Sequence, residues 1–454
     1  MWVILWTDAL VYLLVVVALL GAWQVRRSPH VLDNWRRVAR APLGMAAIVV
    51  LGVYVVIGLA DSVHYRAAAA DGQVVSVLDT LLTPLRESTE TSYSAPFATH
   101  AFTKVSTTHG DGTVTRKYPR LAHGGAHLEH PGQRGRDIRQ RAVRALAVAA
   151  LVWLALAAAA VGWVARRRTP GWRVALGIMV GGRDVLPWRT LLATLGVLLA
   201  LLFLAVELAP RYHVLGTDKV GQDVFYQTLK SIRTGLVIGT LTTLVMLPFA
   251  IGLGVAAGYF GGLVDDVIQY VYTTLNSIPG VLLIAAAILT VQIYMANHAE
   301  ALGTLEDRAD LRLLALCIIL GITSWTNLCR LLRAETLKLR EVEYVQAALG
   351  FGVSHSGIIA RHVVPNVMHI VLITVALDFS GLVLAEAVLS YVNIGVDPTT
   401  NSWGNMINSS RLEMAREPVV WWSLAAAFIF MFTMVLAANV FADAVRDAFD
   451  PRRS

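Results

Sequence analysis

Nine long runs of apolar residues constrain this chain more than any other feature of its sequence. Each run is near or above the roughly 20 residues that an α-helix needs to cross about 30 Å of hydrocarbon. Hydrophobic residue types make up 56% of the chain and charged ones only 15%, a balance typical of a polytopic membrane protein. The sequence predicts nine spans, at residues 2–22, 43–60, 144–165, 190–209, 234–257, 267–295, 311–329, 367–395 and 418–442.

Clusters of arginine and lysine set the expected orientation, because loops rich in these residues stay in the cytoplasm. Residues 24–42, residues 164–189 and the polar stretch from Arg330 to Arg361 are such clusters. All three lie inside on a model with nine spans, which places the N-terminus outside and the C-terminus in the cytoplasm. The loop at residues 61–143 is also basic and falls outside, but loops longer than about 60 residues largely escape this rule.

The chain divides near residue 185. Residues 1–185 hold three predicted spans and a large external insert, residues 61–143, but no motif with an assignable chemistry. Residues 186–454 hold six predicted spans and all the informative motifs. Neither part contains a convincing internal repeat, which removes one sign of a secondary transporter.

Four histidines of the insert lie close in sequence, so a metal site, even one for nickel, is one interpretation of them. Their spacing is not specific, and the glycine pair 124–125 would interrupt any helix that aligned them. We expect a solvated loop and no bound metal. The net charge of +7 is expected from basic cytoplasmic loops rather than from nucleic-acid binding. The four histidines are His109, His123, His127 and His130.

The segment at residues 341–366, EVEYVQAALGFGVSHSGIIARHVVPN, is polar although it lies between two apolar runs. Residues 335–349 favour a helix, and Gly350 and Gly352 permit a sharp turn that a side chain would resist. Ser354 is expected to cap a second short helix, and Pro365 marks the start of the next span. The pattern predicts a helix–turn–helix on the cytoplasmic face, although an ordinary loop would account for its charges alone.

This segment resembles the EAA loop of the permease subunits of binding-protein-dependent ABC importers. In that motif two alanines precede a glycine at a fixed spacing and a Pro-Asn pair closes the segment. The first position is Gln346 here rather than the usual glutamate, which removes a charge and puts a salt bridge to a partner in doubt. The matching positions are Ala347, Ala348, Gly352, His362, Pro365 and Asn366.

Further segments are similar to one branch, the C-type permease subunit of dipeptide, oligopeptide and nickel importers. The sequence GTDKVGQDVF at 216–225 resembles an external segment of the branch, with Gln222 where arginine is usual. The blocks at 257–266, 386–407 and 444–454 also match the branch in order. Tyr270 and Thr273 stand where the branch tends to have an arginine and an aspartate. The matched positions of the external motif are Gly216, Thr217, Asp218, Gly221 and Asp223.

The resemblance implies an all-α, six-helix type I permease core, preceded here by an extension of about three helices. It also implies a bacterial inner-membrane complex with a second permease subunit, two cytoplasmic ATPases and an external solute-binding protein. ATP and magnesium would be bound by the ATPases, and this chain would bind no cofactor. The sequence agrees, because it has no phosphate-binding loop of the G-x-x-x-x-G-K-[ST] type. The chain is therefore expected to be a transport subunit and not an enzyme.

The resemblance assigns the polar segment to docking on an ATPase as a coupling helix. The expected contacts are Glu343, Ala347, Ala348 and Gly352, with Arg361 and His362 in support. Charges in such a loop can equally be solvated surface groups. Peptides are the expected cargo, because the branch mostly carries them.

Two carboxylates inside apolar runs are candidates for the translocation path or its gate, since charge within a membrane is costly. Glu386 has a counterpart in the branch, and a structural hydrogen bond is the alternative to substrate contact. Asp378 has none, and pairing with a neighbouring helix is the alternative. Two other classes of function also remain open: an ion-coupled secondary transporter or channel, and a membrane receptor or scaffold that uses the insert.

Overall fold

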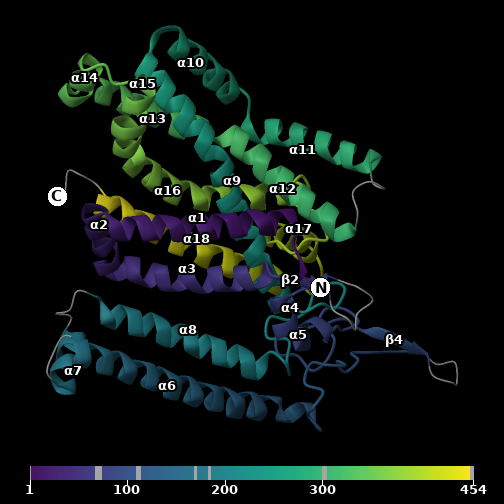
Figure 1. The fold of residues 1–454 in the computed structure, drawn as a ribbon. Coiled ribbons are helices and arrows are strands. Elements are labelled where there is room, and N and C mark those ends of the chain that lie inside the picture. The colour runs from purple at the N-terminus through teal and green to yellow at the C-terminus, as the bar shows by residue number, and fades with distance from the viewer. Residues whose placement is uncertain are drawn as a thin grey trace. The chain divides into compact units, whose positions relative to one another are not determined.

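The computed structural model describes residues 2–66, 74–108, 114–167, 171–181, 186–298 and 304–449. Long helices dominate them, and short strands occur near the N-terminus and in the insert (Figure 1). The elements before the GTD segment, as we call residues 216–225, are β1 (Trp2–Val3), α1 (Trp6–Arg27), α2 (Pro29–Arg40), α3 (Pro42–Asp61), β2 (His64–Arg66), β3 (Val74–Ser76), α4 (Val77–Leu81), α5 (Thr83–Glu87), β4 (Val105–Thr108), β5 (Val114–Lys117), η1 (Pro131–Gln133), α6 (Arg134–Arg167), α7 (Trp172–Gly181) and α8 (Trp188–Leu208). Those that follow are α9 (Val224–Phe260), α10 (Gly262–Ser277), α11 (Gly280–Asn297), α12 (Leu305–Ser324), α13 (Thr326–Arg340), α14 (Glu343–Gly350), α15 (His355–Ile358), η3 (Ile359–Val363), α16 (Val364–Tyr391), α17 (Trp403–Glu413) and α18 (Trp422–Phe449).

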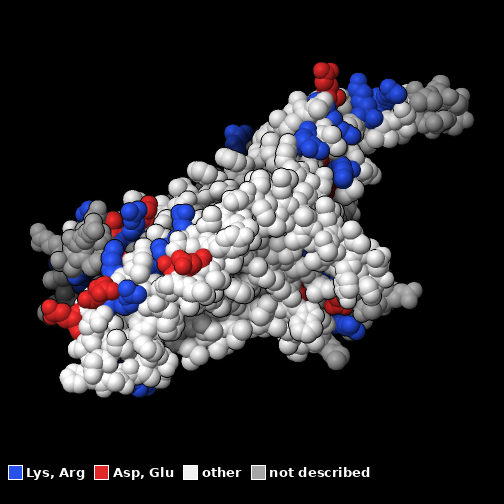
Figure 2. Space-filling model, turned by 90° about the horizontal axis from the view of Figure 1, so that it is seen from above, with Lys and Arg blue, Asp and Glu red and all other residues white. Residues whose placement is uncertain are grey.

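Nine helical stretches of the described residues are long and apolar enough to cross a membrane, which confirms the predicted number. Most of the face in Figure 2 accordingly carries neither acidic nor basic side chains, and the charged ones gather in a few groups. The chain is an all-α, multi-pass membrane protein.

The predicted span at 267–295 was wrong in its first half. α10 ends at Ser277 and α11 begins at Gly280, so the apolar run folds as two helices, of which only α11 is a candidate span. The cause is Pro279, which lacks an N–H group and forces the residue before it out of the helical region. Ile278 is indeed extended, with φ −93° and ψ 130°.

Two compact units interleave along the chain. Residues 36–233 and 401–441 make up most of unit 1, and residues 3–35 and 234–400 make up most of unit 2. The polar segment at residues 341–366, which we call the polar loop, lies entirely in unit 2, and the insert and the GTD segment lie in unit 1.

In unit 1, α6 and α8 run side by side (Figure 1). The indole N–H of Trp153 on α6 donates to the carbonyl of Leu192 on α8 at 2.7 Å, and Gly196 leaves room for the ring. The insert adds two antiparallel strand pairs, β2 with β3 and β4 with β5, in which His64 faces Ser76 and Val105 faces Lys117.

Unit 2 has two apolar cores. One joins α9, α10, α13 and α16 with the polar loop, and its buried members include Leu328, Leu332 and Val367. The other joins α9, α11, α12 and α16, and Leu10 and Val11 of α1 pack against it. The N-terminal helix α1 is fastened there by Thr7, whose backbone N–H and hydroxyl both donate to the buried carboxylate of Asp310 on α12.

Candidate functional site

The polar loop, residues 341–366, links α13 to α16 through α14, a tight turn, α15 and η3. At the end of α14 the N–H groups of Gly352 and Val353 donate to carbonyls of that helix at 3.0 and 3.1 Å. Gly352 has a φ of +77°, in the left-handed region where other residues are strained. Ser354 then caps α15 by accepting from the N–H of Gly357 at 3.3 Å. The predicted turn and cap are confirmed. The predicted helix at 335–349 is instead divided, because α13 ends at Arg340, Val342 is extended and α14 begins at Glu343.

One side of the loop is built into the apolar core of unit 2. Val345 of α14, Ile358 of α15 and Val363 of η3 are 2%, 0% and 0% exposed, and they belong to the same core as α9, α13 and α16. Because interiors are close-packed, these three side chains prevent the loop from shifting independently of the helices beneath it.

The other side of the loop is open. Ala348 and His362 are half-buried, and the remaining residues predicted to contact an ATPase or to close the motif are exposed: Glu343, Ala347, Gly352, Arg361, Pro365 and Asn366. Sequence reasoning missed Phe351, which is 88% exposed at the end of α14. The sequence signal that could have identified it is an aromatic residue directly before the turn glycine.

Hydrogen bonds fasten the loop at two further points. The Tyr259 hydroxyl on α9 lies 3.0 Å from Nδ1 of His355, so α15 is tied to the turn between α9 and α10. Figure 1 places α14 and α15 at the same end of unit 2 as that turn. The side-chain amide of Asn366 donates to the carbonyl of His362 at 2.6 Å and to the hydroxyl of Tyr344 at 3.0 Å. Asn366 therefore stabilises the start of α16 rather than only marking it.

Gln346 has a local role that the usual glutamate cannot fill. Its side-chain amide donates to the carbonyl of Arg340 at 2.7 Å, which satisfies an end carbonyl of α13. An ionised carboxylate accepts hydrogen bonds and cannot donate one. The departure from the family pattern is therefore matched by a contact within the chain.

A bidentate ion pair joins α10 to α13. Nε and Nη2 of Arg333 lie 2.5 and 2.6 Å from the two carboxylate oxygens of Asp265. The hydrogen bond from Arg333 lowers the pKa of Asp265 more than its burial raises it. Tyr270 and Thr273, where the branch tends to have charges, are both exposed on α10.

The GTD segment leads directly into α9. Gly216 and Gly221 have φ values of +72° and +81°, which supplies the physical reason for glycine at both positions. Asp218 accepts from the backbone N–H of Val220 and of Gln222 at 2.9 Å each, so it folds the turn on itself. Asp223 accepts from the N–H of Tyr226 at 3.0 Å and thereby caps α9.

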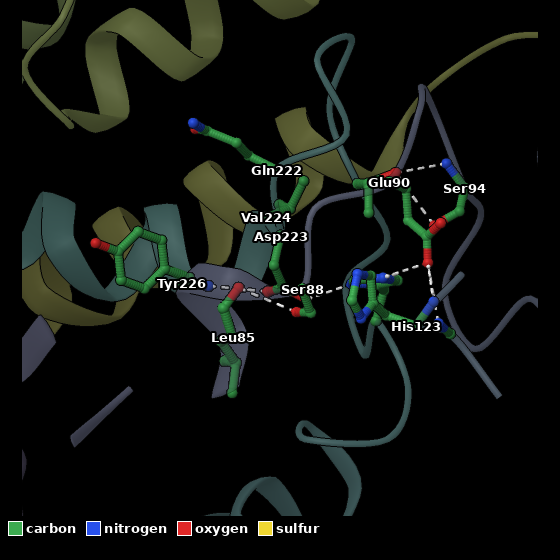
Figure 3. A network of polar contacts seen from close by, with 12 residues as sticks. Leu85, Ser88, Glu90, Ser94, His123, Gln222, Asp223, Val224 and Tyr226 are labelled. Carbon is green, nitrogen blue, oxygen red and sulfur yellow. Dashed lines mark hydrogen bonds and ion pairs between the residues drawn. The ribbon is translucent and has the colours of Figure 1, made fainter. Parts of the chain in front are cut away.

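The insert reaches this segment through a buried carboxylate. Oε1 of Glu90 lies 3.3 Å from Nε2 of His213, whose Nδ1 lies 2.7 Å from Asp223. Glu90 also accepts backbone N–H groups of Ala122, His123 and Gly124 at 2.8, 2.8 and 3.0 Å. Figure 3 shows Glu90 directed toward the backbone at His123.

For both Glu90 and His213, burial and hydrogen bonding shift the pKa in opposite directions. Burial alone raises the pKa of Glu90, but the bonds from His213 and from the three N–H groups outweigh it and lower the pKa to about 2. Burial alone lowers the pKa of His213, but the bonds to Asp223 and Glu90 raise it to about 9. Near neutral pH His213 is therefore protonated and Glu90 is ionised, so the two form an ion pair.

A second buried charge cluster fastens the start of the insert to α9. Nζ of Lys230 lies 2.6 Å from Asp61, the last residue of α3, and 3.0 Å from Asp79 of α4. The Ser76 hydroxyl also donates to Asp61 at 2.6 Å. Sequence reasoning missed both clusters, because their members are far apart in the chain.

The two candidate carboxylates of the translocation path lie on α16. Glu386 is 2% exposed and accepts from the Ser390 hydroxyl at 2.7 Å. Asp378 is half-buried, two helical turns earlier. The assignment of either residue to a path or gate stays a prediction.

The histidines of the insert do not converge within the described residues. There, no three side chains of His, Cys, Asp or Glu are placed to hold a metal ion. His127 instead lies 2.9 Å from the carboxylate of Asp137. His109 and the last five residues, 450–454, lie outside the described residues.

Known proteins match the second half of the chain. The family model described as "Binding-protein-dependent transport system inner membrane component" matches residues 250–454. The "Oligopeptide transport system permease protein OppC" of Mycobacterium tuberculosis is 33% identical over 239 residues, which are 53% of this chain and 76% of that protein.

Relatives described as transporting other solutes align to a similar extent. The "Dipeptide transport system permease protein DppC" of Bacillus subtilis is 28% identical, over 53% of this chain and 69% of the relative. The "Glutathione transport system permease protein GsiD" of Pectobacterium atrosepticum is 30% identical, over 53% of this chain and 73% of the relative. All three relatives are described as permease proteins of transport systems.

Proposed function

The chain belongs to the binding-protein-dependent inner membrane components, the permeases of ABC importers, and on this premise we propose that its polar loop docks on a separate ATPase subunit. ATP hydrolysis on that partner drives a solute through the membrane. The chain itself is a transport subunit and not an enzyme.

The observation that carries the docking proposal is the two-sided construction of the polar loop. Val345, Ile358 and Val363 fix one side in the core, while the other side offers small residues, a tight turn and an exposed Phe351. A large apolar side chain that protrudes from a polar loop favours a protein partner, because its burial there removes apolar surface from water. A push on this side is transmitted to α9, α13 and α16, since the anchored side cannot move without them.

The proposed complex contains a second permease subunit, two cytoplasmic ATPases that hold ATP and magnesium, and an external solute-binding protein. We propose peptides as the cargo, because the relatives are described as oligopeptide, dipeptide and glutathione permeases. The 341–366 loop and the C-terminus lie in the cytoplasm in this proposal, and the insert lies outside.

The test is to replace Gly352 in the assembled importer. Gly352→Trp adds a bulky side chain at a left-handed backbone position on the exposed side of the loop. We expect peptide uptake and binding-protein-stimulated ATP hydrolysis to fall at least about tenfold, the effect of roughly 1.4 kcal/mol lost from docking. The measurements are uptake of a labelled dipeptide and phosphate release in proteoliposomes.

Gly171→Trp is the matched control, because Gly171 also has a positive φ, of +124°, and open space around it. It should leave both rates unchanged. Unchanged rates in Gly352→Trp, or a native chain that recruits no ATPase, would rule out the docking proposal. Ion-driven uptake by the chain alone would point to a secondary transporter, and peptide binding without flux would point to a receptor.

A further inference from the structure

Residues 88–102 of the insert, which we call the brace, follow the GTD segment closely. The backbone N–H of Glu90 donates to the carbonyl of Gly221 at 2.9 Å. A Cβ atom at Gly221 would lie only 1.8 Å from the Glu90 carbonyl oxygen. The motif glycine is therefore needed for two reasons, its positive φ and the close approach of the brace.

A second set of bonds joins the two segments beside Thr217. The N–H of Thr217 donates to the carbonyl of Ser94 at 3.0 Å, and the N–H of Ser94 donates to the Thr217 hydroxyl at 2.7 Å. The Thr217 hydroxyl donates to the carbonyl of Ser92 at 2.9 Å. These buried hydrogen bonds resemble those between two paired strands. The brace and the GTD segment therefore share one hydrogen-bond network.

The brace also reaches the other external part of unit 1. The hydroxyl of Tyr93 donates to Glu413 of α17 at 3.2 Å, and the ring of Phe102 meets Trp422 edge-on, with centroids 4.9 Å apart. The indole N–H of Trp422 donates to the carbonyl of Thr217 at 2.9 Å. The brace thus links the start of α9 to the segment that carries α17 and the start of α18.

Glu90 stands at the centre of these contacts. Its carboxylate is the charged partner of His213, just before the GTD segment, and its backbone N–H donates to Gly221 within it, so one residue holds this region at two points. The side chain is only 2% exposed, and removing a hydrogen-bonding partner from a buried charge is costly.

We propose that Glu90 is a positioning residue for the GTD segment, and that the brace is a permanent part of the transport machinery which stays docked throughout the transport cycle. A passive loop would not be tied by buried charges to two separate external segments. A lid would have to break the same buried charge contacts in every cycle. The proposal rests on the proposed function only in that both of its tests measure peptide transport.

The first test compares Glu90→Gln with Glu87→Gln. Both remove one carboxylate from the insert, but Glu87 is exposed and outside the network. We expect Glu90→Gln to lower peptide uptake and binding-protein-stimulated ATP hydrolysis at least about tenfold, the smaller end of what losing a charged hydrogen bond costs. The amount of co-purified ATPase and basal hydrolysis should stay unchanged, and Glu87→Gln should behave as wild type.

Unchanged stimulation in Glu90→Gln would overturn the positioning role. Loss of the ATPase from native preparations would instead contradict the proposed function, so the two failures are distinguishable.

The second test compares two redox states of one variant, so any weakening caused by its substitutions is common to both. Ser94→Cys with Thr217→Cys places two thiols where the native hydroxyls are 3.1 Å apart, and the natural Cys317 and Cys329 are fully buried. The same preparation is assayed after oxidation and after reduction. A permanent brace predicts equal peptide uptake in both states, whereas uptake that is lost on oxidation and restored by reduction would show that the insert must undock.

Discussion

At the scale of single residues, the buried charges Glu90 and His213, which lie outside the candidate spans, join segments that are distant in sequence. Glu90 and His213 are 123 positions apart, and the contact between them is the basis of the brace. Such a pair is weak evidence for stability as such, because both charges lose their hydration. It is strong evidence for a fixed geometry, because a buried charge is stable only while its hydrogen-bonding partners stay in place.

The pH dependence of this cluster follows from the two pKa shifts. The pKa of His213 rises from its usual value near 6.5 to about 9, so its stabilising contribution is complete below pH 6.5 and is lost as the pH rises through 9. The pKa of Glu90 falls from 4.5 to about 2, so its contribution is complete above pH 4.5 and is lost toward pH 2. We expect backbone N–H groups at 122–124 to exchange most slowly with deuterium, after correction for intrinsic rates, between pH 4.5 and 6.5.

His213→Asn provides the comparison for this prediction. Between pH 6.5 and 9 the corrected protection at residues 122–124 should decline in wild type and stay level in the variant. An equal decline in both proteins would mean that another group controls the insert.

At the scale of elements, local signals in the sequence were enough to predict the turn and the helix cap of the polar loop, but not the break between α13 and α14. Gly352 and Ser354 act through their own backbone and their nearest neighbours, so pattern alone located the turn and the cap. The signal at Pro279 was also local, but the apolar run on both sides of it suggested one continuous span. Hydrophobicity predicts burial in lipid or protein and does not by itself distinguish one helix from two.

Contacts between distant elements could not be predicted in the same way. The role of Gln346 depends on where α13 ends, and the role of Glu90 depends on which turn of the chain packs beside it. No spacing rule connects residues 90 and 213. The histidine-containing part of the insert was therefore predicted to be a solvated loop, although backbone N–H groups at 122–124 donate to the buried Glu90.

At the scale of the whole molecule, the division of the sequence near residue 185 stays a prediction, and the two compact units interleave along the chain. α1 packs in unit 2 with the helices that carry the polar loop, while α3, the insert and α8 belong to unit 1. The N-terminal segments thus take part in both units, and the family model begins only at residue 250.

The expected orientation is open to a labelling experiment. Thr89→Cys in the insert and Ser356→Cys in the polar loop both place a thiol at an exposed position. Cys317 and Cys329 are fully buried and should contribute little background. An impermeant maleimide should label the first variant in intact spheroplasts and the second only after the membrane is opened. Labelling of both from the same side would contradict the predicted topology.

The most direct measurement of ATPase docking is a photo-crosslink from the polar loop. A photoreactive phenylalanine analogue replaces Phe351 in the assembled importer, and a second preparation carries it at Leu305, which is 76% exposed at the start of α12. We expect illumination to join residue 351, and not residue 305, to the ATPase subunit, seen as an adduct of the summed mass. An intact, hydrolysing complex that gives no ATPase adduct from residue 351 would contradict docking through this loop.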